Sequence, residues 1–330
     1  MGLHCGNMSI DKYLYGYIYI ELFHLAGKYG VFNYLVEHNG ASIEELSSEL
    51  ELKEEALKRI LINLAAIDIV SIDEQIFTIS PEYCDLFNAR SDGFIGHYIQ
   101  FIRNQGRAAL QGLEGLLTGV TQEASPYQTL YNSPSDTTDF TEAMWELTYS
   151  TGKALADFLP PLPPGIVDIG GGSGALAIAL FETGCISDIT IFDLPAVQAD
   201  FTHKAIKHQC SDQVSFLAGD FFTDPLPPAA TYFLSYVLSN WSESDILRLL
   251  RRIHQQLAIN GRTLIIFERL FEHNGVAPVS TAIMHLNMLL HTEGGHRSAH
   301  DYHRLLHLSG FSSVEVITTP FDKQLLIATI

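Results

Sequence analysis

The sequence predicts a helical domain over residues 1–157, followed by an α/β domain over residues 158–330 with a doubly wound, mostly parallel sheet. Three observations support this fold class. In the first part, apolar residues recur at helical spacing and strand-like runs are few. After the rigid, proline-rich segment LPPLPPG (159–165), strand-like and helical runs alternate. The last two strand-like runs are too close for a parallel crossover, so we expect them to pair antiparallel.

The most legible part of the helical domain is residues 41–82. Ser42 and Glu45 have the spacing of a capping box at a helix start. A second helix shows one apolar face, made of Leu57, Ile60, Leu61 and Leu64. The runs IVSID and IFTIS, on either side of Glu74-Gln75, predict a β-hairpin. Together these elements predict a winged helix, which either binds DNA or serves as a scaffold or dimer contact.

The charge of the chain favours the second of these roles. A formal net charge of −19 and a pI near 5.0 argue against a nucleic-acid or membrane-surface partner. The cysteines are widely spaced and form no CxxC pair, so we expect reduced thiols: Cys5, Cys84, Cys185 and Cys210. Neither a signal peptide nor an uninterrupted apolar span is visible. We therefore expect a soluble, cytoplasmic protein.

In the α/β domain, the expected parallel strands are GIVDIG, DITIFD, VSFLAG, TYFLSYVL and GRTLIIFE. Helices are expected at residues 196–208, 243–257, 278–291 and 299–308. The runs SVEVITT and KQLLIATI supply the antiparallel end of the sheet. Ligands of such sheets bind beyond the carboxyl ends of the strands, so the residues at those ends are the candidates for function.

Three consecutive strand ends carry residues suited to a nucleotide-like cofactor. The first strand leads into a glycine turn and a helix in VDIGGGSGALAIAL (167–180). The second ends at Asp193, where a carboxylate can accept hydrogen bonds from ribose hydroxyls. The third ends in AGDFF, so Asp220 and Phe221 could bind and cover an adenine ring. A glycine turn alone is weak evidence, and each of these ends could be a plain βα turn. Their succession favours a cofactor site.

The order VDIGGGSG, FDLP, GDFF, an apolar strand before Trp-Ser, and GRTLIIFE resembles the S-adenosylmethionine-dependent small-molecule O-methyltransferases. The caffeic-acid and acetylserotonin types are the most similar in pattern. The resemblance extends over most of the chain, because that family also carries an N-terminal winged-helix dimerisation domain. It implies a class I methyltransferase fold, a homodimer, S-adenosylmethionine as the cofactor and a small-molecule substrate of aromatic or polyketide-like type.

The resemblance also implies which residues hold the methyl donor. The glycine turn and the acidic end of the second strand correspond to Gly170, Gly171, Gly172 and Asp193, and the adenine contacts to Asp220 and Phe221. Further donor contacts are implied at Tyr131, in PYQTLYN, at Thr148 and at Ser235.

At the acceptor side the chain departs from the family. The fourth strand of the family usually ends in His-Asp-Trp, and the His takes the proton from the acceptor hydroxyl. Here the run LSYVLSNW places Ser239 and Asn240 at the His and Asp positions. A serine is not a general base near neutral pH. Two residues in family motifs remain as candidate catalytic groups: Glu268, which ends GRTLIIFE, and His296, in GGHRSAHDY.

The expected acceptor pocket is apolar, with polar groups at its end. Its candidate residues are Met144, Trp145, Ser239, Asn240, His285, Met288 and His291. For each of them, ordinary core or surface packing is the alternative.

The absent His leaves three functions open. Alignment of the reactants can supply about 7–11 kcal/mol, whereas a general base adds about 10²–10⁴-fold. Methyl transfer without the His is therefore feasible for an acceptor that ionises easily. The alternatives are a non-methylating enzyme of pericyclase or hydroxylase type that binds adenosylmethionine, and a catalytically silent binding protein.

A histidine cluster late in the chain has metal-like spacing. His300, His303 and His307 lie three and four residues apart, with Asp301 beside them. No cysteine joins them, and the helix that carries them is expected to pack outside the sheet. We therefore favour a solvated polar face and expect no metal site.

Overall fold

A computed structural model describes residues 4–5, 8–119, 133–272 and 275–330. It divides into two compact units, Met1–Arg107 and Ala108–Ile330. The sequence placed the domain boundary at 157/158, but helix α9 (Pro134–Leu155) packs along α10 (Ala175–Glu182) of the second unit. A Cβ at Gly152 would lie only 2.9 Å from the Cβ of Ala179, so the two helices are in close contact. Helix α9 therefore belongs to the compact unit that contains the sheet.

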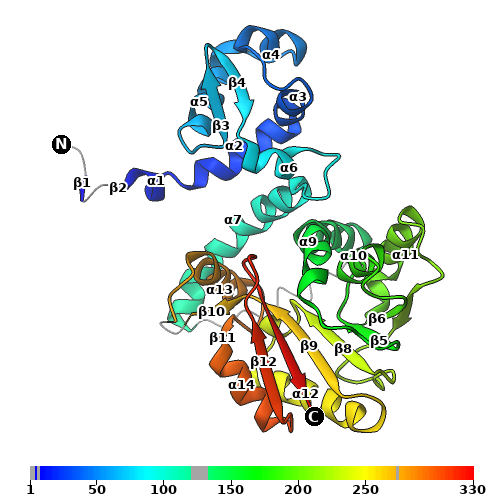
Figure 1. The fold of residues 1–330 in the computed structure, drawn as a ribbon. Helices are drawn as coiled ribbons and strands as arrows, with labels where there is room; N and C mark the ends of the chain where they lie inside the picture. Colours follow the sequence, from blue (N-terminus) through cyan, green and yellow to red (C-terminus); the bar gives the residue numbers. More distant parts are fainter. Residues whose placement is uncertain (1–3, 6–7, 120–132, 273–274) are drawn as a thin grey trace. The chain divides into compact units, whose positions relative to one another are not determined.

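The first unit is mainly helical (Figure 1). Its helices are α1 (Asp11–Leu14), α2 (Tyr17–Lys28), α3 (Val31–Glu37), α4 (Ile43–Glu49), α5 (Glu54–Ala65) and α6 (Cys84–Phe87), and α7 (Gly96–Thr118) runs on into the second unit. Its strands are β1 (His4–Cys5), β2 (Met8–Ser9), β3 (Val70–Asp73) and β4 (Ile76–Ile79). Helices α4 and α5 followed by the β3–β4 hairpin confirm the predicted helix, turn, helix and hairpin.

Local interactions explain why this segment folds as predicted. The Ser42 hydroxyl accepts a hydrogen bond from the Glu45 amide at 3.1 Å and so caps α4. The Glu45 carboxylate accepts from the Tyr34 hydroxyl at 3.1 Å. The hairpin turns at Glu74 and Gln75, both with positive φ, as a tight two-residue turn requires. The apolar face of α5 is buried through Leu57, Leu61 and Leu64.

In the described part of the second unit, seven strands form one sheet in the order β12-β13-β9-β8-β5-β6-β7. The strands are β5 (Ile166–Ile169), β6 (Ile189–Asp193), β7 (Val214–Ala218), β8 (Thr231–Ser235), β9 (Thr263–Glu268), β12 (Ser313–Ile317) and β13 (Gln324–Thr329). Strands β5 to β9 are parallel, and β13 pairs antiparallel with both β9 and β12. The predicted doubly wound sheet with an antiparallel end is confirmed.

Helices cover both faces of this sheet (Figure 1). One face packs on α9, α10 and α11 (Gln198–Lys207), and the other on α12 (Glu243–Asn260) and α14 (Ala299–Leu308). Neighbouring residues of one strand therefore enter different cores: Ile266 of β9 joins the α12–α14 side, and Phe267 the α9–α10 side. Helix α13 (Val279–His291) and the short parallel pair β10 (Leu270–Phe271) and β11 (Arg297–Ser298) follow β9.

Strand β8 is shorter than the apolar run predicted. It ends at Ser235, because Tyr236 has a φ of +58°, a conformation that side chains larger than glycine rarely adopt. The side-chain amide of Asn240 donates through Nδ2 to the Tyr236 carbonyl at 2.8 Å and holds the turn. Leu238–Asn240 then form a 3-10 turn before α12. Across the residues described, no helix is long and apolar enough to cross a membrane.

Candidate active site

The carboxyl ends of the parallel strands bring most of the predicted site residues to one edge of the sheet. The glycine turn follows β5, and turns carrying acidic or polar residues follow the neighbouring strands. In strand order these residues are Asp193 at the end of β6, Asp220 after β7, Ser239 and Asn240 after β8, and Glu268 at the end of β9. This edge is where open α/β sheets bind their ligands.

The glycine turn leaves space for a ligand at one position and is tightly packed at others. Gly170 has a φ of +70°, and a Cβ there would lie 2.8 Å from Cγ2 of Val237. A Cβ at Gly171 would lie 2.6 Å from Oδ2 of Asp168. At Gly172, with a φ of +57°, no atom lies within 4 Å of the Cβ position. The backbone can therefore approach a ligand closely at Gly172.

Asp193 is tied to this turn. Its Oδ2 accepts a hydrogen bond from the Gly172 amide at 2.7 Å, and its Oδ1 accepts from the Leu194 amide at 2.6 Å. Burial raises the pKa of Asp193 to about 6, although both backbone hydrogen bonds act in the opposite direction. The structure thus joins the predicted ribose-binding carboxylate to the predicted glycine turn.

Asp168, inside β5, is a further candidate site residue that the sequence analysis did not identify. It is 1% exposed, and neither carboxyl oxygen has a hydrogen-bond partner among the residues described. Burial and the nearby Asp193 carboxylate raise the pKa of Asp168 to about 8. A buried polar group without partners is costly and marks a place for a complementary group. The signal in the sequence is a carboxylate within the otherwise apolar run IVDIG.

The turn after β7 carries the predicted adenine contacts. Asp220 uses Oδ1 to accept from the Phe222 amide at 2.8 Å, which stabilises the turn. The Phe221 ring is half-buried and meets Trp241 edge-on, with centroids 5.9 Å apart. On the same edge, the Ser235 hydroxyl is buried without a partner in the described chain.

The remaining predicted donor contacts precede β5 in the sequence. Thr148 is 9% exposed on α9. Tyr131 lies outside the described residues. Both roles stay predictions.

Among the residues predicted for the acceptor side, Ser239 and Glu268 are in direct contact. The Ser239 amide donates to Glu268 Oε1 at 3.1 Å, and the two residues are 2% and 0% exposed. Oε2 of Glu268 has no partner in the part of the chain described. Burial raises the pKa of Glu268 to about 7. Glu268, which the resemblance predicts to be a catalytic-site carboxyl, thus holds the backbone at Ser239, the position predicted for the family His.

The GGHR loop packs directly on this turn. A Cβ at Gly294 would lie 2.1 Å from the Ser239 carbonyl oxygen, so only glycine fits there. The Arg297 guanidinium donates to the Trp241 carbonyl at 3.2 Å and to the Gly295 carbonyl at 2.9 Å, which locks the loop in place.

His296 is therefore brought to the site, but as a buried neutral ring. It is 5% exposed, and neither ring nitrogen has a described partner. Burial, with a smaller effect of Arg269, lowers the pKa of His296 to about 4. A group with this pKa is a weak general base near neutral pH.

The other predicted acceptor residues divide into two groups. His285 is exposed, and its ring touches the Gly295 position and meets Phe271 at 5.3 Å. Met288 is buried on α13, and burial lowers the pKa of the half-buried His291. Met144 is half-buried on α9.

Trp145 lies in a different environment. Its ring stacks on Tyr149 at 4.7 Å, and the Lys204 ammonium lies 4.3 Å from its centroid. This placement favours packing between α9 and α11 over contact with an acceptor.

A buried lysine at the same edge was also missed. Lys323 immediately precedes β13 and is 3% exposed. Its Nζ donates to the Leu147 carbonyl of α9 at 3.2 Å and lies 4.6 Å from the ring centroid of Tyr236. No motif surrounds it, and the only signal in the sequence is one lysine within FDKQLLIATI.

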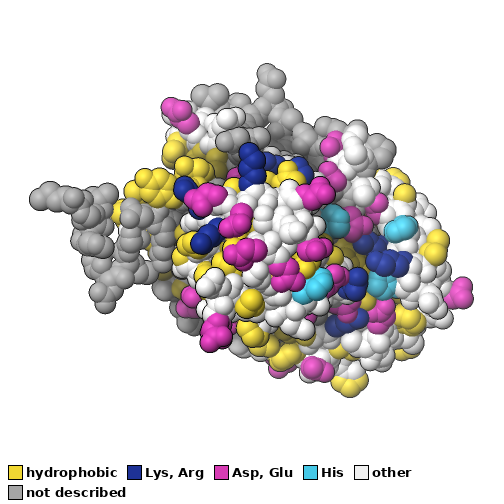
Figure 2. Space-filling model, turned by 90° about the horizontal axis from the view of Figure 1, so that it is seen from above, with side chains coloured by type: hydrophobic (Ala, Val, Ile, Leu, Met, Phe, Trp, Pro, Cys, Tyr) yellow, Lys and Arg dark blue, Asp and Glu magenta, His cyan; other side chains and the backbone are white. Residues whose placement is uncertain are grey.

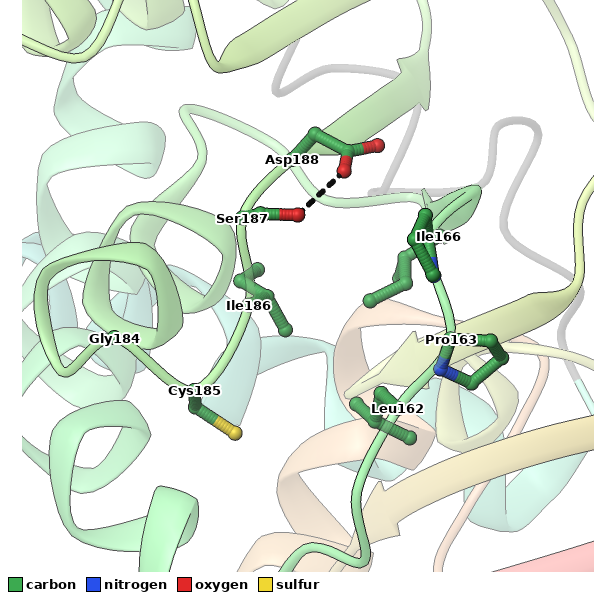
Figure 3. A pocket seen from close by; sticks show the side chains of 9 residues that line it. Leu162, Pro163, Ile166, Gly184, Cys185, Ile186, Ser187 and Asp188 are labelled. Atoms are coloured by element: carbon green, nitrogen blue, oxygen red, sulfur yellow. Dashed lines mark hydrogen bonds between the residues drawn. The ribbon is translucent and has the colours of Figure 1, made fainter.

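A cavity of about 350 Å³ lies at the opposite edge of the sheet, where β5 and β6 begin (Figure 3). Its lining includes the proline-rich segment before β5 and the α10–β6 turn, with Cys185 and Asp188. The hydrogen bond drawn there joins the Ser187 hydroxyl to Asp188 at 2.8 Å. None of the predicted site residues lines it. The described residues contain no group of three or more His, Cys, Asp or Glu side chains arranged to hold a metal ion.

Comparison with known proteins gives the family context. A family model of O-methyltransferase domains matches residues 114–312, which is more than half of the 330-residue chain. Acetylserotonin O-methyltransferase of Homo sapiens is 37% identical over 190 residues, covering 56% of this chain and 53% of that protein. The alignment thus spans about half of the human protein's length. The Macaca mulatta protein of the same name is 27% identical over 331 residues, covering 93% and 92%.

Among solved structures, human N-acetylserotonin methyltransferase in complex with SAM superposes with a TM-score of 0.84. It is 22% identical in sequence, and the match covers 98% of this chain and 99% of that one. At this identity the likeness establishes the fold, which is that of the class I O-methyltransferases.

Proposed function

The chain belongs to the family of O-methyltransferase domains, and on that premise we propose that it methylates an oxygen atom of a small molecule with S-adenosylmethionine as donor. The observation that carries the proposal is the arrangement of residues at the carboxyl edge of the sheet, where the donor is expected to bind. An open glycine position at Gly172 is hydrogen-bonded to the buried Asp193. An unpartnered carboxyl, Asp168, lies beneath the same turn.

These residues fit the chemical groups of the donor. Asp193 is suited to ribose hydroxyls, which would donate to its carboxylate oxygens. Asp168 is suited to the ammonium group, because a cation would satisfy its buried oxygens. Phe221 and Asp220 are suited to the adenine ring. When bound, the donor supplies an electrophilic methyl group on a sulfonium.

For the acceptor we propose a hydroxylated aromatic or polyketide-like molecule. The relatives are named for acetylserotonin, and the apolar Met144 and Met288 are two candidate residues for such a pocket. Proton removal does not use Ser239, whose hydroxyl does not titrate near neutral pH. Nothing in the described geometry favours the non-methylating or silent alternatives.

Two measurements test this function. Calorimetry should show binding of S-adenosylmethionine and S-adenosylhomocysteine to the purified chain. Incubation with a panel of hydroxylated aromatic compounds, N-acetylserotonin included, should release adenosylhomocysteine together with a methyl ether. Binding of the donor without release on any member of the panel would reject the acceptor class. Absence of donor binding would reject the function itself.

We also propose that the protein forms a homodimer through its first unit. Helices α1 and α2 and the residues between them expose large apolar side chains: Leu14 is 55% exposed, Tyr15 55% and Tyr17 70%. Such surface is expected to be covered by a partner, and a second copy of the chain is the partner proposed. Light scattering at micromolar concentration should give twice the monomer mass. A monomer mass would contradict the dimer.

The winged helix is not proposed to bind nucleic acid. On the face seen in Figure 2, Lys and Arg side chains lie among Asp, Glu and His side chains. The net charge of −19 acts against a polyanionic partner.

A further inference from the structure

Lys323 is a buried amine with little around it to stabilise a positive charge. Its Nζ lies 4.6 Å from the ring centroid of Tyr236 and 5.5 Å from that of Phe267. The hydrogen bond described for it runs to a neutral acceptor, the Leu147 carbonyl at 3.2 Å. These surroundings lower the pKa of Lys323 to about 7, with burial as the cause.

The nearest carboxylate is engaged elsewhere. Oδ1 of Asp322 lies 3.6 Å from the Lys323 Nζ, but Oδ2 of the same residue forms an ion pair with Arg269. Asp322 is also 38% exposed, so water screens its charge. Of the other elements around the amine, β9 contributes Phe267, the turn after β8 contributes Tyr236, and α9 contributes the Leu147 carbonyl. The effect of burial on the pKa of Lys323 is therefore larger than that of the Asp322 carboxylate. A substantial fraction of Lys323 is the neutral amine near physiological pH.

The strained turn after β8 presents the Tyr236 ring to this amine. Tyr236 keeps its positive φ because both ends of its backbone are held. Its amide donates to the Phe267 carbonyl at 3.2 Å, and its carbonyl accepts from Asn240. Its hydroxyl is buried and without a described partner. Backbone strain of this kind clusters at functional sites. Asn240, at the position of the family Asp, thus acts as a positioning residue.

Lys323 approaches the carboxyl edge from the opposite face to the Ser239–Glu268 pair. Gln324 pairs with Glu268 in the β13–β9 register, so these two side chains share a face. Lys323, one residue earlier, packs over Phe267 on the α9 side. Ser239, at the position predicted for the family His, therefore lies on one face of the sheet. Lys323, a titratable group with no role assigned so far, lies on the other.

We propose that Lys323, as the neutral amine, takes the proton from the acceptor hydroxyl and so replaces the absent histidine as general base. This rests on the proposed function. The acceptor O–H bond breaks and its proton passes to Nζ, which becomes an ammonium. The acceptor oxygen gains the methyl group, and the C–S bond electrons return to the donor sulfur. No further reactant is needed.

The charge of the site explains why a buried lysine suits this step. With the cationic donor bound at the same edge of the sheet, a second positive charge nearby is disfavoured, and Lys323 is therefore neutral before transfer. Lys323 becomes positive in the same step in which the sulfonium charge disappears. The net charge of the buried site is unchanged, so no large reorganisation of solvent is required.

The other candidates at this edge suit the step less well. The pKa of His296 is lowered to about 4, and Glu268 is fully buried with one oxygen bound to the Ser239 amide. Lys323 combines a pKa near the working pH with a place at the carboxyl edge, and general-base catalysis further requires that the bound acceptor hydroxyl lie within hydrogen-bond reach of Nζ.

The first test measures the lysine directly and needs no acceptor. Lysines are labelled with ¹³C at Cε, and the Lys323 signal is assigned by its absence in Lys323→Met. We expect it to titrate near neutral pH with adenosylhomocysteine bound, and at a lower pH with adenosylmethionine bound. Titration in the usual lysine range, or no difference between the two complexes, would overturn the proposal.

The second test measures transfer to phenols of graded acidity. Lys323→Met should lose about 10²–10⁴-fold in kcat on weakly acidic phenols, and little on 4-nitrophenol, which is largely ionised at the assay pH. The acid limb of the wild-type pH profile should disappear. Lys323→Arg should behave like Lys323→Met, because a guanidinium cannot accept the proton. Added methylamine should restore part of the activity of Lys323→Ala.

Lys204→Met is the matched control. Lys204 is also buried, at 5% exposed, and lies over the ring of Trp145, but it is paired with Glu142 at 2.7 Å on the α9–α11 side. This variant should keep the wild-type pH profile. Equal losses on all phenols, without amine rescue, would assign Lys323 a structural role and reject the base. If the chain binds donor but methylates no phenol, the acceptor class fails, while the carbon-13 titration still decides on Lys323.

Discussion

The proposed donor side and the proposed acceptor side of one sheet edge differ in how well short motifs describe them. On the donor side, the glycine turn, Asp193 and Asp220 lie at the ends of consecutive strands, as the motifs predict. On the proposed acceptor side, Ser239 and Asn240 stand where the resemblance predicts a His-Asp pair, and they shape the backbone through hydrogen bonds.

The difference shows which functions a short sequence motif is sufficient to predict. Donor binding depends on backbone geometry and on carboxylates at fixed positions after each strand, and short motifs encode both. Proton transfer depends on pKa values, which burial and neighbours from distant segments determine. The motif therefore shows that the expected base is absent, but a replacement base from a distant segment leaves no trace in it.

The largest effect is expected from removing the buried lysine. The pKa of Lys323 is lowered in the folded chain, so its buried charge costs most below pH 7, where the residue is protonated both folded and unfolded. That cost fades as pH rises toward the ordinary lysine pKa of about 10.4. Lys323→Met should therefore raise the free energy of unfolding at pH 6 by on the order of 3 kcal/mol, and much less at pH 10. Denaturant unfolding at both pH values measures this.

Lys204→Met serves as the control for that measurement. It removes an ion pair with Glu142 and should lower stability at both pH values. If Lys323→Met lowers stability at pH 6 as well, Lys323 is not a costly buried amine, and the contrast between the two sides of the edge is weakened.

On the proposed donor side, the largest effect is expected from removing Asp193. Asp193→Ala should weaken adenosylmethionine binding by about 2–3 kcal/mol, because it removes a hydrogen-bonded carboxylate and leaves the Gly172 amide without its acceptor. Calorimetry compares it with Asp188→Ala, a carboxylate at the opposite edge of the sheet, which should bind as the wild type does. Unchanged affinity in Asp193→Ala would remove this residue from the donor site.

Most of the fold was predictable from the sequence, because periodicity and turn residues carry it. The winged helix was predicted from Ser42 and the Glu74-Gln75 turn, and the sheet from the alternation of strand-like and helical segments. The domain boundary was not legible, because α9 has the composition of the helical domain but packs on α10. The end of β8 was also misjudged, since the strained conformation of Tyr236 depends on hydrogen bonds to Phe267 and Asn240.

The motifs name residues that lie together in the structure. Gly172 is in contact with Asp193 and Ser239 with Glu268, while the roles assigned to these residues stay predictions. Asp168 and Lys323 were missed, because what distinguishes them is burial without a partner that stabilises their charge. Burial of this kind is a property of the packed structure and has no local sequence signal.

The pH dependence of donor binding distinguishes Asp168 from Asp193. Burial raises the pKa of Asp168 to about 8, so near neutral pH a proton competes with the donor's ammonium for this carboxyl. Affinity should fall about tenfold, or about 1.4 kcal/mol, per pH unit between about pH 7.5 and 6.5. Asp168→Asn should bind more weakly but lose this dependence, leaving only the fall below about pH 6 that Asp193 causes. A flat profile in the wild type would show that Asp168 does not need to ionise.

The smallest effect is expected where the family pair is restored. In the Ser239→His, Asn240→Asp variant, the ionised carboxylate introduced at position 240 cannot donate to the Tyr236 carbonyl, so the strained turn loses about 1 kcal/mol of support. The new histidine must also fit a site that is 2% exposed, between Glu268 and the loop at Gly294. Because Lys323 is the proposed base, native methylation should be unchanged or a few-fold slower. Adenosylhomocysteine release against pH measures this, with Asn240→Asp alone as the control for the turn. A gain of about tenfold or more from the pair, absent in the single variant, would show that proton removal had been limiting and that no residue had replaced the histidine.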